Sequence, residues 1–239
     1  MDPQGSTATT QAPDALVAVL PAVLGDFAPA FVLTDASNGG FVISYTDQFG
    51  TSTTDTDIST VTYNAAGQVV SGPNLAVGST NDERHSSVTS YFGGLALAYT
   101  DFSSTSGDVV LARFNSSGGP QGFTNVNNLQ TAGEQSHPHI AELKNNNVAV
   151  TWWNGNTGDI RMRVWTGTSF ITDEVSISSG QVSSANEVKA LEKGGFVVTW
   201  EQYSVADNWQ IYTRVFDSTG NALTGPRAYF AMARDGRLW

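Results

Sequence analysis

Three histidines are the residues of this chain best suited to acid–base or metal chemistry near neutral pH. His137 and His139 flank a proline in the stretch GEQSHPHIAEL, and His85 precedes a second stretch of similar pattern. Imidazole titrates near neutral pH, and its ring nitrogens bind metal ions. If these side chains meet in the fold, they could transfer protons or hold an ion.

Three interpretations of the histidines are open. They could be polar residues at the start of a strand, hydrogen-bonded to neighbouring backbone. They could form a zinc site, with His85, His137 and His139 as ligands and an open position that would allow catalysis. Glu187 or Glu134 would then supply a carboxylate ligand. They could also form a metal-free pocket, in which His and Glu act as acid and base or bind a polar ligand.

A second group of candidates lies in polar loops that contain aromatic and acidic residues. Aromatic faces stack on sugar rings while carboxylates bond hydroxyls, so these loops are typical of a carbohydrate platform. The aromatic residues could instead fill gaps between packed sheets. Two of the carboxylates could serve as the pair that glycoside hydrolysis requires. Asp47, Asp55 and Asp57 could hold Ca²⁺, or they could simply be solvated. The carbohydrate candidates are Trp153, Tyr203, Trp209, Asp101, Asp159 and Glu201.

These candidates must be positioned by a unit of about 50 residues that occurs four times. A strand ending in an aromatic residue begins at positions 41, 95, 148 and 196, with the sequences FVISY, LALAY, VAVTW and FVVTW. Each follows a turn and precedes a polar loop and a second strand: ISTVTY, VVLARF, IRMRVW and IYTRVF. Three of these second strands run into Asn- or Asp-containing turns that end in glycine.

Each unit also has a short strand before the first motif and a less regular strand after the second. Four strands in about 50 residues, joined by hairpin turns, describe one blade of a β-propeller. A single blade cannot bury both of its faces, so the blades must pack on one another around an axis. We therefore predict an all-β propeller of four four-stranded blades. A β-sandwich is the alternative, but it would not need so even a repeat.

The repeat sets the expected domain boundaries. We expect a flexible segment over residues 1–13, one propeller domain over 14–230 and a tail over 231–239. The stretch DALVAVL at 14–20 resembles an isolated fourth strand, so we expect it to close the ring by pairing with the last blade. The segment 221–230 competes for that edge. The chain could also associate into a larger ring as a homo-oligomer.

The first strand of each propeller blade lies nearest the axis, so the histidines at the starts of these strands can be placed in the fold. All three histidines fall at one repeat-equivalent place, where the first unit has Ala28 and Ala30 and the fourth has Ala185 and Glu187. This place should ring the mouth of the central channel, on the face that carries the long loops. His137 and His139 are two residues apart, so we expect them to point together.

The last unit, LEKGGFVVTWEQYSVADNWQIYTRVFDSTGNAL, resembles a repeat found in large secreted bacterial proteins, often beside glycine-rich calcium-binding repeats. The shared pattern is an apolar strand, a Gly-Gly turn, FVVTW, a polar loop and an RVFD…G strand end. The resemblance covers about residues 30–215. It implies an extracellular location and a role in binding or adhesion, and it implies no particular catalytic residues. The acidic loops here depart from the regular Asp-Gly pattern of the calcium-binding repeats.

Composition limits the possible partners. The formal net charge is −11, so nucleic acid and anionic membrane surfaces are poor partners. The chain has no cysteine, which excludes disulfides and thiolate sites. No apolar run approaches the ~20 residues that cross a bilayer. The first residues do not form a signal peptide, although the composition fits a secreted bacterial protein.

Two functions follow as hypotheses. The first is a secreted, non-catalytic module that binds carbohydrate or another cell-surface ligand on the long-loop face. The alternative is a glycan-acting hydrolase with a His/carboxylate site at the channel mouth. Zinc and calcium are the possible cofactors. The propeller fold supports either function, so the choice depends on the site.

Overall fold

The computed structural model describes residues 30–32, 39–48, 55–104, 106–129, 131–178, 182–206 and 208–231. These residues form strands and turns, and no helix among them could cross a membrane. The predicted flexible segment 1–13, the stretch 14–20 and the tail beyond residue 231 lie outside the described residues.

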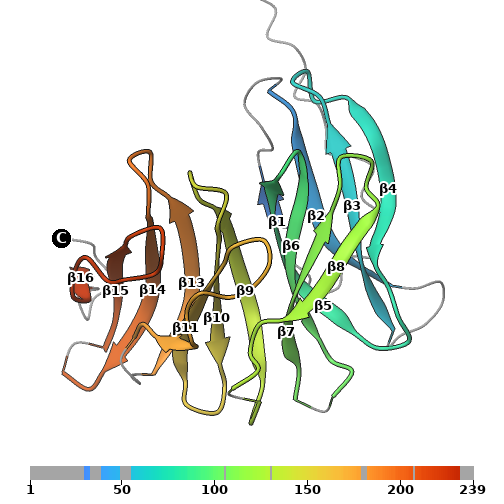
Figure 1. The fold of residues 1–239 in the computed structure, drawn as a ribbon. Helices are drawn as coiled ribbons and strands as arrows, with labels where there is room; N and C mark the ends of the chain where they lie inside the picture. The colour runs from blue at the N-terminus through green and yellow to red at the C-terminus, as the bar shows by residue number, and fades with distance from the viewer. Residues whose placement is uncertain are drawn as a thin grey trace, which may run out of the picture.

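The strands form four antiparallel sheets, each made of four strands that are consecutive in sequence (Figure 1). Blade 1 contains β1 (Ala30–Val32), β2 (Phe41–Gln48), β3 (Thr56–Tyr63) and β4 (Val69–Val77). Blade 2 contains β5 (Glu83–Tyr91), β6 (Gly94–Asp101), β7 (Asp108–Phe114) and β8 (Pro120–Asn125). Blade 3 contains β9 (Gln135–Glu142), β10 (Val148–Asn154), β11 (Asp159–Trp165) and β12 (Val175–Ser176). Blade 4 contains β13 (Ser183–Ala190), β14 (Phe196–Ser204), β15 (Asn208–Phe216) and β16 (Arg227–Ala231).

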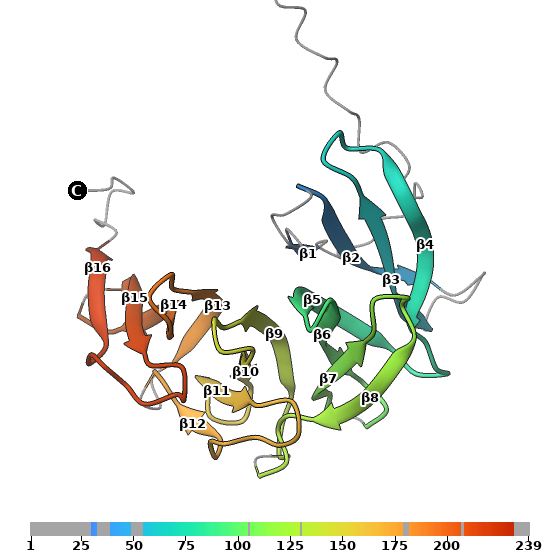
Figure 2. The same ribbon diagram turned by 45° about the horizontal axis from the view of Figure 1, so that its top comes forward.

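The four blades follow one another along an arc, with blades 1 and 4 at its two ends (Figure 2). The first strands of the blades line the inside of the arc: β1 packs on β5, β5 on β9, and β9 on β13. This arrangement confirms the predicted four-bladed architecture and the inner position of the first strands. No strand pairing joins one sheet to another among the described residues.

The edge of the last blade is occupied differently from the primary prediction. β16 pairs with β15, with Thr213 opposite Arg227 and Gln210 opposite Ala231. The competing segment 221–230 therefore supplies the fourth strand of blade 4, and the edge of β15 is not available to residues 14–20. The short loop between β15 and β16 explains this pairing. The entropic cost of closing a short loop is smaller than that of bringing in a strand from the other end of the chain.

The hydrophobic core lies between the blades: β2, β6 and β10 bury consecutive residues on both of their faces, whereas β14 buries residues on one face. Val150 and Trp152 of β10 pack with Ala98 of blade 2, whereas Ala149 packs with Val198 of blade 4. Burial on both faces accounts for the nearly continuous apolar runs of the first motifs in blades 1, 2 and 3. Full burial of each large side chain stabilises the fold by about 1.5–3 kcal/mol.

Two arginines connect adjacent blades. Arg163 Nη1 donates to the carbonyl oxygen of Val126 in blade 2 at 2.8 Å. Arg214 Nη1 donates to the carbonyl oxygen of Ile177 in blade 3 at 3.4 Å. In both cases the acceptor is a backbone carbonyl of the preceding blade.

Candidate functional site

A β-bulge interrupts the first strand of blades 2, 3 and 4 at the same place. In β5 the register shifts between Arg84 and Ser87, and in β13 it shifts between Ser184 and Asn186. In β9 it shifts between Ser136 and His139, which lie opposite Trp153 and Thr151 of β10. The residue at each bulge has a left-handed backbone: φ is 54° at His85, 52° at His137 and 39° at Ala185. Such bulges redirect side chains and are common beside functional sites.

The bulges bring His85 and His137 together across the boundary between blades 2 and 3. Their ring centroids are 3.9 Å apart and the planes differ by 21°, so the imidazoles stack. His85 Nδ1 lies 3.4 Å from Thr100 Oγ1, and His137 Nδ1 lies 2.9 Å from Ser136 Oγ. We expected repeat-equivalent histidines to meet at the N-terminal ends of the inner strands, and this pair does so.

His139 faces the opposite neighbour. Its Nδ1 lies 3.0 Å from Glu187 Oε2 of blade 4, and Lys189 Nζ lies 3.8 Å from the other carboxylate oxygen. We expected His137 and His139 to point together, but one contacts blade 2 and the other blade 4. The bulge explains this difference, because the extra residue breaks the two-residue alternation of a strand. Together these side chains form a row across three blades, the inner-strand site of His85, His137, His139 and Glu187.

Burial controls the charge of this site. Burial, with smaller effects of His137 and Arg84, lowers the pKa of His85 to about 4. Burial also lowers the pKa of His137, against the opposing charge of Glu134. The hydrogen bond with His139 lowers the pKa of Glu187. At neutral pH the stacked imidazoles are therefore uncharged and Glu187 is ionised.

The zinc hypothesis finds no geometric support in the part of the chain that the structure describes. That part contains no group of three or more His, Asp or Glu side chains placed to hold a metal ion. His85, His137 and His139 are directed at different partners, and Glu134 acts on His137 only through its charge. Asp47, Asp55 and Asp57 are among the described residues, and none of them belongs to such a group, so the calcium hypothesis has no geometric support either.

Most of the predicted carbohydrate candidates lie apart from the inner-strand site. Trp153 is half-buried and packs against the core between blades 3 and 4, so it fills a gap between sheets. Asp159 is buried and paired with Arg161 at 3.3 Å. Asp101 accepts a hydrogen bond from the backbone N–H of Ser103, which fixes a turn. These three residues have structural roles in the described contacts.

Tyr203 and Trp209 differ, because both rings are exposed. They are cross-strand neighbours with centroids 5.6 Å apart, on the face of blade 4 that is turned away from blade 3. Their exposed fractions are 37% and 39%. Glu201 lies on the same face and accepts a hydrogen bond from Ser184 Oγ at 3.1 Å.

The structure adds a pair of buried acids that sequence analysis did not single out as a pair. Glu83 of β5 is 2% exposed, and burial raises its pKa to about 7. Asp57 of β3 is also buried, and burial, with the charge of Asp55, raises its pKa. Ser79 Oγ donates to Glu83 Oε1 at 2.6 Å. The negative charge of Asp57 also raises the pKa of Glu83 across the boundary of blades 1 and 2.

Comparison with known proteins identifies the architecture. No family model matches the chain, and no curated protein matches it either. The four sheets around an axis define a β-propeller, and solved structures share it at low sequence identity. The resemblance to the secreted bacterial repeats is therefore supported for the propeller fold and for no particular family.

Three of these structures illustrate the likeness. A protein of unknown function from Dyadobacter fermentans is 12% identical, with a TM-score of 0.58, over 88% of this chain and 72% of the other. A GH43 endo-arabinanase from Bacillus licheniformis is 14% identical, with a TM-score of 0.52, over 87% and 80%. An α-L-arabinofuranosidase from Podospora anserina, solved with cellotriose, is 8% identical, with a TM-score of 0.52, over 87% and 68%.

Proposed function

We propose that this protein acts on a glycan and cleaves a glycosidic bond at the inner-strand site. The proposal depends on one observation. His85, His137, His139 and Glu187 form a row across three blades, in the N-terminal parts of the inner strands. Several proteins of the same architecture are named as glycan-cleaving enzymes, including the endo-arabinanase and the arabinofuranosidase. The hydrolase alternative is therefore preferred to the binding module.

The residues of the site divide into two roles. Glycoside hydrolysis needs one carboxylate that activates water or attacks the sugar, and one acid that protonates the leaving oxygen. Glu187 fits the first role, because its pKa is lowered and its side chain is half-exposed. We assign the second role to Glu134 beside His137, which would have to bind a proton before it can act as the acid. The uncharged rings of His85 and His137 would bind sugar hydroxyls.

The test is a screen of the purified protein against a glycan array and a panel of glycoside substrates. Once a substrate is found, Glu187→Gln should lower kcat by at least about 100-fold, the usual scale for a lost acid–base group. His137→Ala should weaken binding and keep the fold, because Ala185 already adopts the same backbone conformation. Glu192→Gln is the matched control, an exposed carboxylate in a turn at the other end of the same blade. Equal activity of Glu187→Gln and the control would remove the proposal.

A non-catalytic binding function is the second candidate, and one observation favours it. The exposed pair of Tyr203 and Trp209 offers two aromatic faces beside Glu201, as a sugar-binding surface does. If glycans bind without turnover, and Trp209→Ala abolishes the binding while Glu187→Gln does not, this second function is the correct one.

A further inference from the structure

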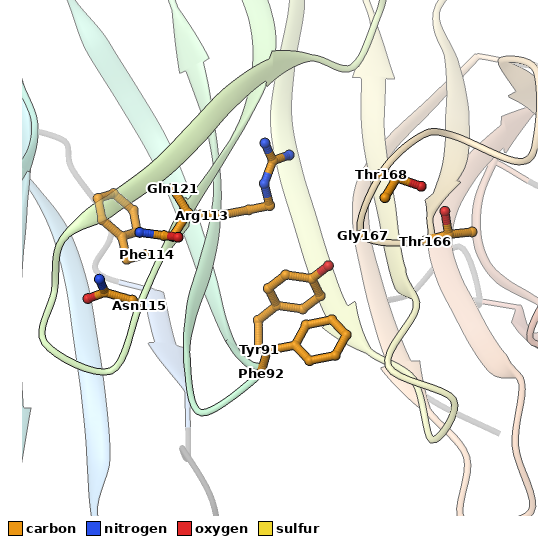
Figure 3. A pocket seen from close by; sticks show the side chains of 9 residues that line it. All are labelled: Tyr91, Phe92, Arg113, Phe114, Asn115, Gln121, Thr166, Gly167 and Thr168. Atoms are coloured by element: carbon orange, nitrogen blue, oxygen red, sulfur yellow. The ribbon is translucent and has the colours of Figure 1, made fainter.

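A cavity lies between blades 2 and 3, at the opposite end of the strands from the histidines. Its volume is about 510 Å³. Three turns surround it: the hairpin that follows Tyr91, the hairpin that follows Phe114 and the loop at Thr166–Thr168. Figure 3 shows the rings of Tyr91 and Phe92 between the two outer walls, with Arg113 directed into the same space.

Phe92 occupies a position that an aromatic residue rarely takes. It is the first residue of a two-residue hairpin loop, where both residues have positive φ: 46° at Phe92 and 74° at Gly93. Asn and Gly are usual at such positions. In the matching turns of the other blades the described residues with positive φ are Gly39, Asn146, Gly194 and Gly195.

The phenyl ring of Phe92 is mostly exposed, so packing in the core does not explain its strained backbone. It is 65% exposed, and its ring contact is an edge-to-face arrangement with Tyr91 at 4.7 Å. Strained residues that are kept by a fold concentrate at binding sites. An exposed aromatic ring held beside a cavity is suited to contact with a ligand.

Arg113 supplies a cation to the cavity. Its guanidinium lies 4.5 Å from the centre of the Trp165 ring, and Nη1 donates to Thr124 Oγ1 at 3.0 Å. Gly122 leaves room for it, since a Cβ there would lie 2.6 Å from Nη2. Arg163 and Arg214, in contrast, point to the other face of their blades and donate to backbone carbonyls.

The guanidinium faces a cavity that contains no acidic side chain. A guanidinium carries five N–H donors, and no ion pair of Arg113 occurs among the described residues. No Asp or Glu is among the residues that line the cavity, although the whole chain has a net charge of −11. The planar fork of N–H donors on the Arg113 guanidinium matches a carboxylate. Asn115, Gln121 and Thr168 add groups that can bond hydroxyls.

We propose that this cavity binds an acidic sugar, a uronic acid residue of a glycan. The carboxylate of the sugar would bond Arg113, the C–H face of the ring would lie on Phe92 and Tyr91, and the hydroxyls would bond the polar wall. The proposal does not rest on the inner-strand site, which lies at the other end of the blades. It assigns the opposite face of the protein a ligand of its own.

The test is calorimetric titration with a trimer of galacturonic acid and with its methyl ester. The acid should bind and the neutral ester should bind at least ten-fold more weakly. Arg113→Gln should weaken binding of the acid by a similar factor, and Arg113→Lys should restore part of it. Equal binding of acid and ester, or no binding of the acid at millimolar concentration, would overturn the proposal.

A second variant tests the aromatic wall independently of the charge. Phe92→Asn suits the backbone of the turn, so it should keep or raise the melting temperature while it weakens binding of the trimer. A fall in melting temperature with unchanged affinity would assign Phe92 a purely structural role and overturn this part. Glu192→Gln, a control in an exposed turn, should bind the trimer as the wild type does. If inorganic sulfate displaces the trimer at equal concentration, the cavity binds simple anions and the sugar assignment is wrong.

Discussion

The imidazole of His85 stacks on that of His137 with 3.9 Å between ring centroids, across the boundary of two blades. The residues are 52 positions apart (137 − 85) and lie on equivalent bulges of the repeat. Protonation of either ring would place a charge in a half-buried contact with a neighbouring ring. The contact therefore makes stability depend on pH.

We expect His85 to destabilise the fold as the pH falls from 6.5 to 4. Its pKa is about 4 in the folded protein and 6.5 as a free side chain, so the unfolded chain binds the additional proton in this range. His85→Asn, which suits a positive φ, should be more stable than the wild type at pH 5 and similar at pH 7.5. Urea denaturation at the two pH values measures the difference. A constant difference at both values would contradict the assignment.

We expect Glu83 to act in the opposite direction. Its pKa rises from 4.5 to about 7 on folding, so the folded protein binds the additional proton and loses stability as the pH rises through this range. Glu83→Gln removes the buried charge and should stabilise the protein at pH 8 by about 1–3 kcal/mol. The gain should disappear at pH 4.5. Because the effects of Glu83 and His85 oppose each other, the wild-type profile between pH 4.5 and 6.5 should be shallow.

Arg163 should contribute more to stability than an ordinary surface arginine. It is buried, and it donates to Val126 O at 2.8 Å and to Asn128 Oδ1 at 2.7 Å in blade 2. Arg163→Ala should lower the free energy of unfolding by about 2–3 kcal/mol, because buried acceptors lose a charged donor. Arg84→Ala, which removes the half-exposed ion pair with Asp82, should cost less than about 1 kcal/mol. Equal losses in the two variants would show that the hydrogen bonds of Arg163 to blade 2 stabilise the protein no more than a half-exposed ion pair does.

The two tryptophans of the polar loops should respond differently to alanine. Trp153 packs against the core between blades 3 and 4, so Trp153→Ala should destabilise the protein by about 2–3 kcal/mol. Trp209 is 39% exposed, and Trp209→Ala should change stability by less than about 1 kcal/mol. Thermal denaturation of both variants checks this difference. A large loss in Trp209→Ala would indicate that its face of blade 4 is covered in solution.

The four-bladed architecture could be predicted because the repeat appears directly in the sequence. The strands β2, β6, β10 and β14 start at the positions where the aromatic-ended motifs start, except that β6 begins at Gly94, one residue early. The common place of His85 and His137 was also visible from the register. Periodicity carries this information because each unit must bury the same two faces.

The directions of the side chains could not be predicted in the same way. The bulge at His137 has no signal in the sequence, since Ala185 occupies the same conformation in blade 4. The electrostatic interaction between Asp57 and Glu83 joins different blades and depends on how closely the blades approach. The strained turn at Phe92 reads as an ordinary FGG turn until its backbone angles are known. In each case tertiary packing decides the outcome.

The linear order of the blades has a mechanical consequence. Each inner blade is held by two neighbours, whereas blades 1 and 4 each have one neighbouring blade among the described residues. In such a nearest-neighbour array the terminal units open first, and unfolding spreads inward from the ends. The stacked imidazoles and the Arg113 cavity both lie at the central boundary between blades 2 and 3, so both would survive fraying of the ends.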